Sequence, residues 1–576
     1  MWSNTARAVK WASGAILLVA AGMFVTGARH AQASPAKTAA QTGAGQVALV
    51  RSRIKHIFVI YQENHTFDNY FGSFPGAENL ASPLAQAHGF RQYDPIGKQW
   101  VTPFRITDPD TSGPSQSRDV IEAKMNGGAM DRFVQEQEKK SSAEFGPEDA
   151  QSVGLLTMAF YDCDTVPYLW KYAKTFTLFD HYFQAMAGPS TPNNVEIIAA
   201  QAGQSQAARD AADRVDSGKK PGVPIYGDLD PAYPPYEQGG KSKSTQIDQQ
   251  YATLMLTLGG TDDVAAKANT AGVRDDLRTV ANSGKAAIPW AWYQEGFNGT
   301  DTGDPGYEAH HNAPQYFGYL RNNAVFWKNV RPVKTLLSQL EEGALPSRGI
   351  FYVKGGSNNT FGWKPVDPDP VVQKNTLGDD DHPGISDTDH QVGEAFVATF
   401  VNAIARSRYW KDSAIIITWD DAGGYYDHVP PPNFEQCSDG HPCGDGPRLP
   451  LMIVSPYAKS GAVVHDAGDT ASVLKFAETV LGVRSLASLP DEKPYLPQGP
   501  RDASSRITDL LGAFDAARLK GTRPPIPAAA ATIDDAIVNR IPTPMNCKTL
   551  GITPAAVPGA DRAPAGYRAR TRVFVP

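Results

Sequence analysis

Two pairs of oxygen-bearing side chains stand directly after apolar runs of the sequence. Glu63 and Asn64 follow the run IKHIFVIYQ, and Asp420 and Asp421 follow AIIITW. Carboxylate and amide oxygens are hard ligands that suit a divalent cation, and two adjacent acids repel each other unless a cation or a proton neutralises one of them. Each pair alone also fits a turn with capping or solvated side chains. Each pair therefore leaves two alternatives open, an ordinary turn or a site for one divalent metal ion whose identity the residues do not fix.

A hydroxyl at a predicted helix start is the next candidate. In the segment GPSTPNNVEIIAA, Ser190 or Thr191 lies near the expected cap and Pro192 lies in the first turn. The segment is therefore either an ordinary helix start or an anion site, in which free backbone N–H groups and the helix dipole surround the hydroxyl. A metal ion beside that hydroxyl would make it a nucleophile.

Histidines in polar segments supply a third kind of group. His310 and His311 precede NAPQYF, and His382 lies in GDDDHPG. A single histidine in such a segment is most often a surface residue. Beside a phosphate group, however, imidazoles stabilise charge and protonate a leaving oxygen.

Apolar runs and amphipathic stretches alternate along the chain and define the elements that position these groups. Strands are expected at residues 54–64, 287–296, 349–356, 413–424 and 449–459. Helical periodicity begins at Val392 and at Ser472. This alternation predicts an α/β fold with a mostly parallel central sheet and helices on both faces. The polar clusters then lie just beyond the carboxyl ends of strands, where such sheets place their functional residues.

The domain organisation follows from composition. We expect one catalytic domain over residues 46–489, with long insertions rich in Gly, Pro, Ser and Asp at 75–118, 204–250 and 357–391. Loops of this length in a compact protein are usually functional. Residues 490–576 are rich in Pro and Ala and are expected to pack over the domain as a tail.

The N-terminus indicates export. Arg7 and Lys10 precede an apolar run, and the small-residue pattern Ala31-Gln32-Ala33 follows it. This order predicts a signal peptide at residues 1–33, although a membrane anchor is the alternative. Residues 34–45 are expected to form a disordered mature end, in a periplasmic or secreted protein with no stable membrane span. The net charge of −7 provides no overall basic field, so a nucleic-acid partner is not expected.

The chain has four cysteines, an even number that suits an oxidising compartment. They are Cys163, Cys437, Cys443 and Cys547, and three pairings are possible. A local disulfide between Cys437 and Cys443 is the preferred pairing, because the two residues are close in sequence.

Taken together, these segments resemble the phosphoesterase family of bacterial acid phosphatases and phosphatidylcholine-type phospholipases C, within the alkaline phosphatase superfamily. The resemblance runs from about Ile54 to Leu481. ENHTFDNYFG resembles the family's opening motif, GPSTPNN its nucleophile motif, DDDHPG its histidine loop and WDDAGGYYDHVPPP its second metal motif. It implies an alkaline-phosphatase-like core.

By this resemblance, one metal ion is bound by Glu63, Asn64, Asp420 and Asp421. Ser190 is implied as the nucleophile that forms a phosphoserine. The remaining implied groups are His311 and His382, which would contact the phosphoryl group, and Asn193 and Arg118, which would bind substrate.

Two positions depart from the family pattern. Gln116 or Arg118 stands where many relatives carry a histidine, and Thr470 stands where relatives often have another. An arginine could still bind phosphate with two hydrogen bonds and without titrating.

Small sequence differences distinguish the acid phosphatases of this family from its phospholipases C. The Asp-Asp pair resembles the acid phosphatases, whereas phospholipases more often have Asp-Glu followed by His-Gly-Gly. The sequence also lacks twin arginines in its signal and C-terminal β-rich modules, both common in phospholipases. We therefore expect an exported, metal-dependent acid phosphatase that hydrolyses phosphate monoesters through a phosphoserine. The alternatives are a phospholipase C acting on phosphatidylcholine and a non-catalytic phosphate-binding protein.

Overall fold

The computed structural model describes the greater part of the chain: residues 43–87, 89–203, 225–240, 246–259, 270–384, 388–434, 444–497 and 499–570. The predicted signal peptide and the preferred Cys437–Cys443 disulfide lie outside these residues. Within the described part, no helix combines the length and the apolarity needed to cross a bilayer.

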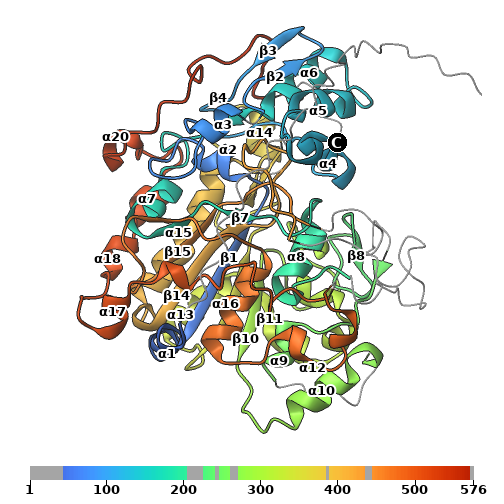
Figure 1. Ribbon diagram of the computed structural model, residues 1–576, viewed down its shortest axis with the longest axis vertical. Helices are drawn as coiled ribbons and strands as arrows, with labels where there is room; N and C mark the ends of the chain where they lie inside the picture. The colour runs from blue at the N-terminus through green and yellow to red at the C-terminus, as the bar shows by residue number, and fades with distance from the viewer. Residues whose placement is uncertain are drawn as a thin grey trace, which may run out of the picture. The chain divides into compact units, whose positions relative to one another are not determined.

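An eight-stranded sheet forms the centre of the fold, in the order β11-β10-β12-β1-β14-β15-β6-β16 (Figure 1). Its strands are β1 His56–Gln62, β6 Thr177–Phe179, β10 Trp290–Gln294, β11 Val330–Pro332, β12 Gly349–Lys354, β14 Ser413–Trp419, β15 Leu451–Val454 and β16 Ala462–Val464. All five predicted strands are present. Only β15 runs antiparallel to its neighbours, so the predicted α/β fold with a mostly parallel sheet is confirmed.

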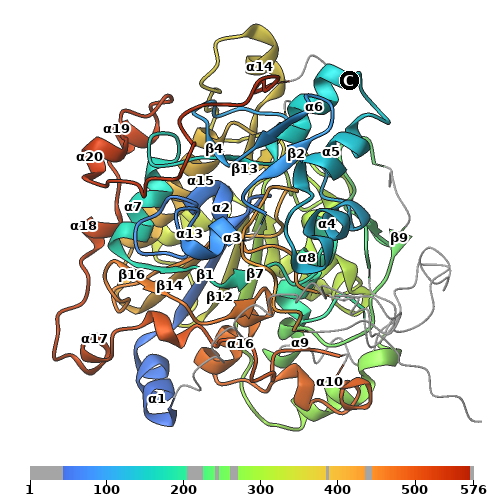
Figure 2. The ribbon, with the colours of Figure 1, turned by 45° about the horizontal axis from the view of Figure 1, so that its top comes forward.

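The central strands are apolar on both faces because both faces are covered. On β1, Phe58 and Ile60 enter one hydrophobic core, whereas Ile57 and Val59 enter the other. The first core includes residues of α7 Pro167–Thr175, α13 Lys334–Glu342 and α15 His390–Arg406. The second includes residues of α1 Ala44–Arg53, α8 Ser190–Ala199 and α16 Ala471–Leu481. Figures 1 and 2 both show α7 and α15 on one side of β1 and α8 on the other.

The parallel register brings three strand ends to one edge. Tyr61 of β1 pairs with Lys354 at the end of β12, and Gln62 pairs with Trp419 at the end of β14. Residues that follow β1 and β14 are therefore neighbours, although 357 positions separate Asn64 from Asp421. A short strand, β13 Gly378–Pro383, lies beside them, since the Glu63 N–H donates to the Asp380 carbonyl at 2.7 Å.

Short elements fill the long insertions and the remaining connections. The further strands are β2 Gln92–Asp94, β3 Gln99–Val101, β4 Phe104–Arg105, β5 Ala159–Phe160, β7 Tyr182–Phe183, β8 Asp230–Pro231, β9 Gln246–Ile247 and β17 Gly468–Asp469. The further helices are α2 Phe67–Phe71, α3 Pro83–Ala87, α4 Arg118–Met125, α5 Phe133–Ser141, α6 Pro147–Leu156, α9 Leu254–Thr257, α10 Arg274–Ala281, α11 Gly318–Arg321, α12 Ala324–Asn329 and α14 Pro370–Asn375.

The residues after position 490 form short helices that contact the domain. They are α17 Ala516–Lys520, α18 Ala528–Ala531, α19 Asp535–Val538 and α20 Cys547–Leu550. Of these, α18 and α19 contact α15, and α20 contacts α7. A disulfide between Cys163 and Cys547 ties the last helix to the segment before α7.

Helix α1 includes the last two residues of the segment that was expected to be disordered. Residues 34–45 were expected to be disordered, with the catalytic domain beginning at 46, but α1 begins at Ala44. Val50 of this helix is buried in the second core. The boundary at residue 490 stays a prediction.

Candidate active site

The two predicted pairs of oxygen ligands meet in one buried cluster. Glu63, Asn64, Asp420 and Asp421 are each fully buried. The Asn64 amide donates to Asp421 Oδ2 at 2.9 Å, and the Asp420 N–H donates to the Gln62 carbonyl at 3.0 Å. The parallel pairing of β1 with β14 therefore brings the four predicted ligands together.

Ser190, the predicted nucleophile, lies between two of the carboxylates. It is the first residue of α8, with Pro189 at the N-cap and Pro192 in the first turn. Its hydroxyl donates to Glu63 Oε2 at 3.0 Å or to Asp421 Oδ2 at 3.1 Å. The helix start thus places a hydroxyl within the proposed ligand set.

The two asparagines that follow have different contacts. Asn194 donates to the Ser190 carbonyl at 2.9 Å and to Asp420 Oδ2 at 3.0 Å, so it connects α8 to the carboxylates. Asn193 was expected to bind substrate, but its amide bonds to the backbone of Met186 and Pro189. Its contacts stabilise the turn before Ser190, because that turn would otherwise leave these buried backbone groups unpaired.

Lys354 belongs to the cluster, although the sequence analysis did not select it. Its ammonium donates to Glu63 and, at 3.1 Å, to Asp420 Oδ2, and it lies 4.8 Å from the centre of the Tyr61 ring. Burial opposes its charge, but Asp420 and Glu63 raise the pKa of Lys354 above its usual value. A lysine at the end of a predicted parallel strand was the signal that could have found it.

Burial and the close packing of the acids raise the pKa values of Glu63 and Asp421. Burial and the Asp420 charge raise the pKa of Glu63 well above its usual value. Burial and the same charge also raise the pKa of Asp421. Three carboxylates face one ammonium, so a divalent cation would bring the sum of formal charges near zero.

His311 lies against the cluster, in a short helical turn at residues 309–311. Its Nε2 is 3.2 Å from Glu63 Oε1 and its Nδ1 is 2.6 Å from Glu308 Oε2. Burial, with His310 and Lys354 nearby, holds the pKa of His311 well below its usual value. Glu63, His311 and Asp420 have ligand atoms close enough to share a metal ion. His311 therefore lies among the proposed ligands.

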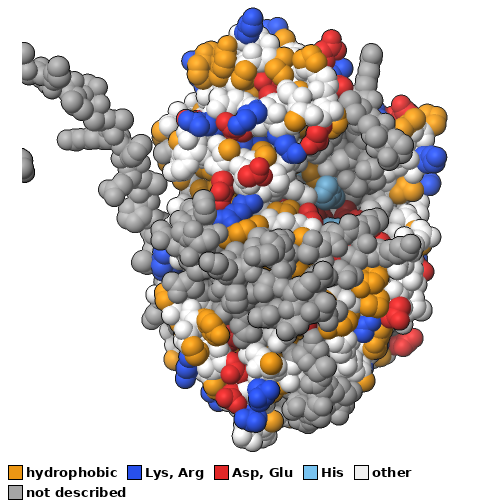
Figure 3. Space-filling model, turned by 90° about the vertical axis from the view of Figure 1, so that its right-hand side faces the viewer, with side chains coloured by type: hydrophobic (Ala, Val, Ile, Leu, Met, Phe, Trp, Pro, Cys, Tyr) orange, Lys and Arg blue, Asp and Glu red, His pale blue; other side chains and the backbone are white. Residues whose placement is uncertain are grey.

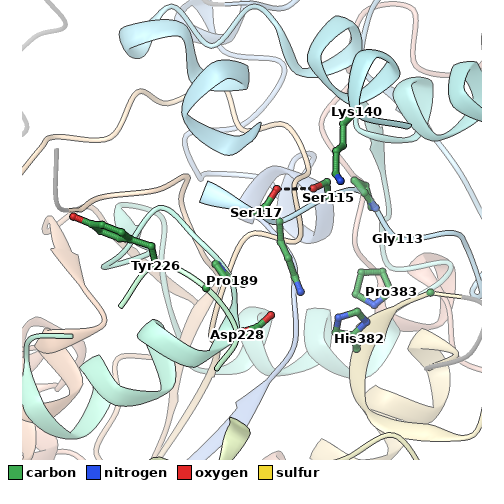
Figure 4. A pocket seen from close by; sticks show the side chains of 13 residues that line it. Gly113, Ser115, Ser117, Lys140, Pro189, Tyr226, Asp228, His382 and Pro383 are labelled. Atoms are coloured by element: carbon green, nitrogen blue, oxygen red, sulfur yellow. Dashed lines mark hydrogen bonds between the residues drawn. The ribbon is translucent and has the colours of Figure 1, made fainter. Parts of the chain in front are cut away.

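A pocket of about 520 Å³ lies in front of the α8 N-terminus. Its lining residues are Gly113, Pro114, Ser115, Gln116, Ser117, Lys140, Pro189, Tyr226, Gly227, Asp228, His382, Pro383 and Gly384. Figure 3 shows a hollow on one face of the molecule in which a histidine and acidic side chains are visible. Asp228 and His382 point toward the space between them (Figure 4). Asp228 Oδ1 accepts a hydrogen bond from the Thr191 N–H at 3.0 Å.

Gln116 and Arg118, the two candidates for the position where many relatives carry a histidine, lie in different places. Gln116 accepts a hydrogen bond from the Asn64 amide, so it reaches the cluster. Arg118 donates to Glu122 at 2.7 Å, and its guanidinium lies 3.6 Å from the centre of the Tyr226 ring. Arg118 therefore stacks on a residue of the pocket wall, while Gln116 lies beside the proposed ligands. Thr470 accepts from the Ala185 N–H at 3.3 Å.

Gly423 and Gly424 of WDDAGGYYDH allow the backbone after Asp421 to pack closely against the backbone of Asn64 and Ser115. A Cβ at Gly423 would lie 2.1 Å from the Asn64 carbonyl oxygen, and one at Gly424 would lie 2.3 Å from that of Ser115. Both have a positive φ, which favours glycine. The Lys124 ammonium then joins the Ser115 and Gly424 carbonyls, at 3.0 and 2.9 Å.

Asp427 and His428, which follow the Asp420-Asp421 pair in sequence, contact residues outside the cluster. Asp427 accepts from the buried Arg448 at 2.8 Å. His428 contacts Asp68 at 2.6 Å and Glu78 at 3.2 Å. These contacts attach the segment after Asp421 to the segment after β1, so they support the cluster indirectly.

The donor set fits a divalent cation. The Oδ1 atoms of Asn64 and Asn194 are buried and have no hydrogen-bond partner within the described residues. Unpaired buried acceptors beside an excess of carboxylate oxygens are an environment that a cation stabilises.

Comparisons with known proteins show what this chain is similar to. The model of the Phosphoesterase family matches residues 54–484. The non-hemolytic phospholipase C of Burkholderia pseudomallei is 23% identical over 516 residues, which cover 82% of this chain and 61% of that enzyme. Phospholipase C B of Mycobacterium tuberculosis is 24% identical over 484 residues, which cover 77% and 76%. A solved phosphonate monoester hydrolase from Silicibacter pomeroyi aligns with a TM-score of 0.25 and 12% identity, over 56% of this chain and 69% of that one.

Proposed function

The chain belongs to the phosphoesterase family, and from this premise we propose that it is a metal-dependent phosphodiesterase of the phospholipase C type. The observation that carries the proposal is the Ser190 hydroxyl, 3.0 and 3.1 Å from two buried carboxylates. This arrangement supports a serine nucleophile beside a cation.

The choice of substrate class reverses the preference drawn from the sequence. An acid phosphatase was preferred there because of the Asp420-Asp421 pair. Three relatives that align over three quarters or more of this chain are named phospholipases C, which favours a phosphodiester. One pair of acids is a weaker indication than a match over most of the chain. Phosphomonoester hydrolysis remains the second candidate on the strength of that pair.

In the proposed mechanism, Ser190 attacks phosphorus of the diester, the bond from phosphorus to the leaving alcohol oxygen breaks, and a serine phosphodiester forms. Water then hydrolyses this intermediate to a phosphomonoester and free Ser190. The hydroxyl is oriented by Glu63 and Asp421. The N-terminus of α8 faces the pocket, so the Thr191 N–H would bind a phosphoryl oxygen in place of Asp228. His382, on the opposite side of the pocket, would donate a proton to the leaving oxygen.

The proposed metal ligands are Glu63, Asn64, Asp420 and Asp421, and His311 is placed to join them. One divalent cation, when bound there, would lower the pKa of the Ser190 hydroxyl and offset the charge of the phosphate. Calcium, magnesium, manganese and zinc all accept such oxygen ligands.

The test compares a diester with a monoester on the full-length mature protein. We expect faster release of nitrophenol from p-nitrophenylphosphorylcholine than from p-nitrophenyl phosphate, and loss of both activities in Ser190→Ala and with a chelator. Faster turnover of the monoester would restore the acid phosphatase assignment. Phosphate binding without turnover of either compound would indicate a non-catalytic relative.

Export to the periplasm or the medium is part of the proposal. The predicted signal peptide supports it, and the Cys163–Cys547 disulfide suits an oxidising compartment. N-terminal sequencing of protein secreted by its host should begin at Ser34.

A further inference from the structure

A second group of ligand-type side chains lies at the edge of the sheet, on residues that the proposed active site does not use. Asp180 and His181 follow β6, and His465 follows β16. The two strands pair in parallel, with Phe179 opposite Val464. Their carboxyl ends are therefore adjacent, and the Asp180 N–H donates to the Val464 carbonyl at 3.2 Å.

The three side chains converge on the Asp180 carboxylate. His181 Nδ1 is 2.8 Å from Asp180 Oδ1. His465 Nδ1 is 2.9 Å from Oδ1 and 2.8 Å from Oδ2. The ring centres of the two histidines are 6.0 Å apart. The Asp180 side chain is fully buried, whereas those of His181 and His465 are 21% and 57% exposed. The carboxylate thus forms the floor of a small site that opens to solvent between two imidazoles.

We propose that Asp180, His181 and His465 form a second metal site, which takes zinc or a similar transition-metal ion. Two imidazole nitrogens and a carboxylate oxygen are the ligands that zinc prefers, and a water molecule completes its tetrahedral shell. Their ligand atoms lie close enough together to share one ion. The set differs from the oxygen-rich active-site cluster, so the two sites should prefer different metals.

The surroundings keep the carboxylate available as a ligand. Burial opposes its charge, but hydrogen bonds from His181 and His465 lower the pKa of Asp180 well below its usual value. The Glu78 N–H also donates to Asp180 Oδ2 at 2.8 Å. The nearby Arg448 cation donates to the Asp180 carbonyl and is itself paired with Asp68 and Asp427. These contacts hold Asp180 in place at the floor of the site.

The site has a structural consequence for the rest of the chain. Asp180 begins the segment that leads through Pro189 to Ser190, and the Gly468 N–H donates to the His181 carbonyl at 3.0 Å. A metal ion bound here would hold β6, β16 and this segment together. We therefore expect it to stabilise the fold without taking part in the chemistry at Ser190.

The alternative is that Asp180 only pairs with two imidazoles, since 2.8 Å is also a hydrogen-bond distance. The experiment compares wild type, His465→Ala and His181→Ala, with Asp466→Asn as a control beside the site. Each mature protein is loaded with zinc chloride and dialysed, and its zinc content is measured by elemental analysis. We expect both histidine variants to hold one zinc equivalent per chain less than wild type and the control.

Two further measurements distinguish loss of metal binding from loss of folding or of activity. Cobalt(II) should give a visible d–d absorption band in wild type that weakens in His465→Ala. Zinc should raise the unfolding temperature of wild type and Asp466→Asn more than that of the histidine variants. Equal zinc content and equal cobalt spectra in folded wild type and His465→Ala would overturn the proposal. Because zinc is counted directly, this result does not depend on whether Ser190 is catalytic.

Discussion

At the scale of single residues, Lys354 changes the interpretation of the carboxylate cluster. Glu63, Asp420 and Asp421 carry three negative charges when ionised, and Lys354 is the cation that contacts Glu63 and Asp420. With one divalent ion, the four side chains would be close to neutral before an anionic substrate binds. Lysine and metal ion would thus share the neutralisation of this site.

We predict that Lys354→Met lowers the free energy of unfolding of the metal-free protein by about 3–5 kcal/mol, because buried carboxylates lose their paired cation. The loss should become smaller when a divalent ion saturates the cluster. Urea unfolding in chelator and in excess metal measures both values. Lys328→Met, at an exposed position of α12, is the control. If Lys354→Met lost the same free energy of unfolding with and without metal, the lysine and the metal ion would not share the neutralisation of the carboxylates.

Asp228 is the second residue whose role depends on its position. Its carboxylate accepts the Thr191 N–H that we assign to a phosphoryl oxygen, so it competes with the phosphate group and also repels it. We predict that Asp228→Asn lowers the inhibition constant of inorganic phosphate about 2–10-fold, which corresponds to one hydrogen bond.

Competitive inhibition of diester hydrolysis measures the effect of Asp228→Asn. Asp275→Asn on α10 removes the same charge at an exposed pair with Arg278 and should leave inhibition unchanged. An unaltered or higher inhibition constant in Asp228→Asn would mean that phosphate does not use this N–H.

At the level of secondary structure, the buried Glu138 connects helix α5 to the hairpin of β2 and β3. Glu138 on α5 accepts the Ile96 N–H from the turn between β2 and β3 at 3.2 Å. Burial, together with a hydrogen bond to Asp94 and the charge of that residue, raises the pKa of Glu138 to about 9. The folded protein therefore holds a proton that the unfolded chain loses near its ordinary pKa of about 4.3.

The sign of the pH effect follows from this difference in bound protons. Between those two pKa values the folded state binds more protons, so stability falls as pH rises from about 4.3 to about 9. We predict that Glu138→Gln, which resembles the protonated side chain, reduces this fall. Urea midpoints at pH 5 and pH 8 test it, with Glu136→Gln on the same helix as control. A slope equal to that of wild type would contradict the prediction.

At the scale of the whole molecule, the C-terminal residues are attached by packing and by one covalent bond. Cys163 and Cys547 are 384 positions apart, and α20 contacts α7. Closing so long a loop restricts the unfolded chain more than the folded one.

We predict that Cys547→Ser lowers the free energy of unfolding by about 2–5 kcal/mol. It should also speed limited proteolysis after α17, where Lys520 is exposed. Lys548→Ser, the neighbouring substitution on α20, keeps the disulfide and serves as control. Unchanged stability and unchanged cleavage in Cys547→Ser would show that packing alone attaches the tail.

The strands of the central sheet were predictable from the sequence alone, and the metal ligands remain a prediction from it. Runs such as IKHIFVIYQ and AIIITW are apolar on both faces, a local property that indicates buried parallel strands. A helix start near Ser190 was also predicted from local signals, with Ser190 or Thr191 near the cap and Pro192 in the first turn. The structure places the N-cap at Pro189, so Ser190 is the first residue of α8. The motif order then identified the phosphoesterase family, and the match over residues 54–484 confirms it.

Only the tertiary structure decided which groups meet. Whether Lys354 reaches Glu63, whether Asn193 bonds to backbone, and whether Asp180 lies between His181 and His465 all depend on pairing between distant strands. Such contacts join residues that are far apart in sequence, and periodicity carries no information about strand order or about β15 running antiparallel. For the same reason, the charge balance of the active site could not be read from the chain. It depends on a lysine that the register of β12 against β1 brings to the two predicted ligand pairs.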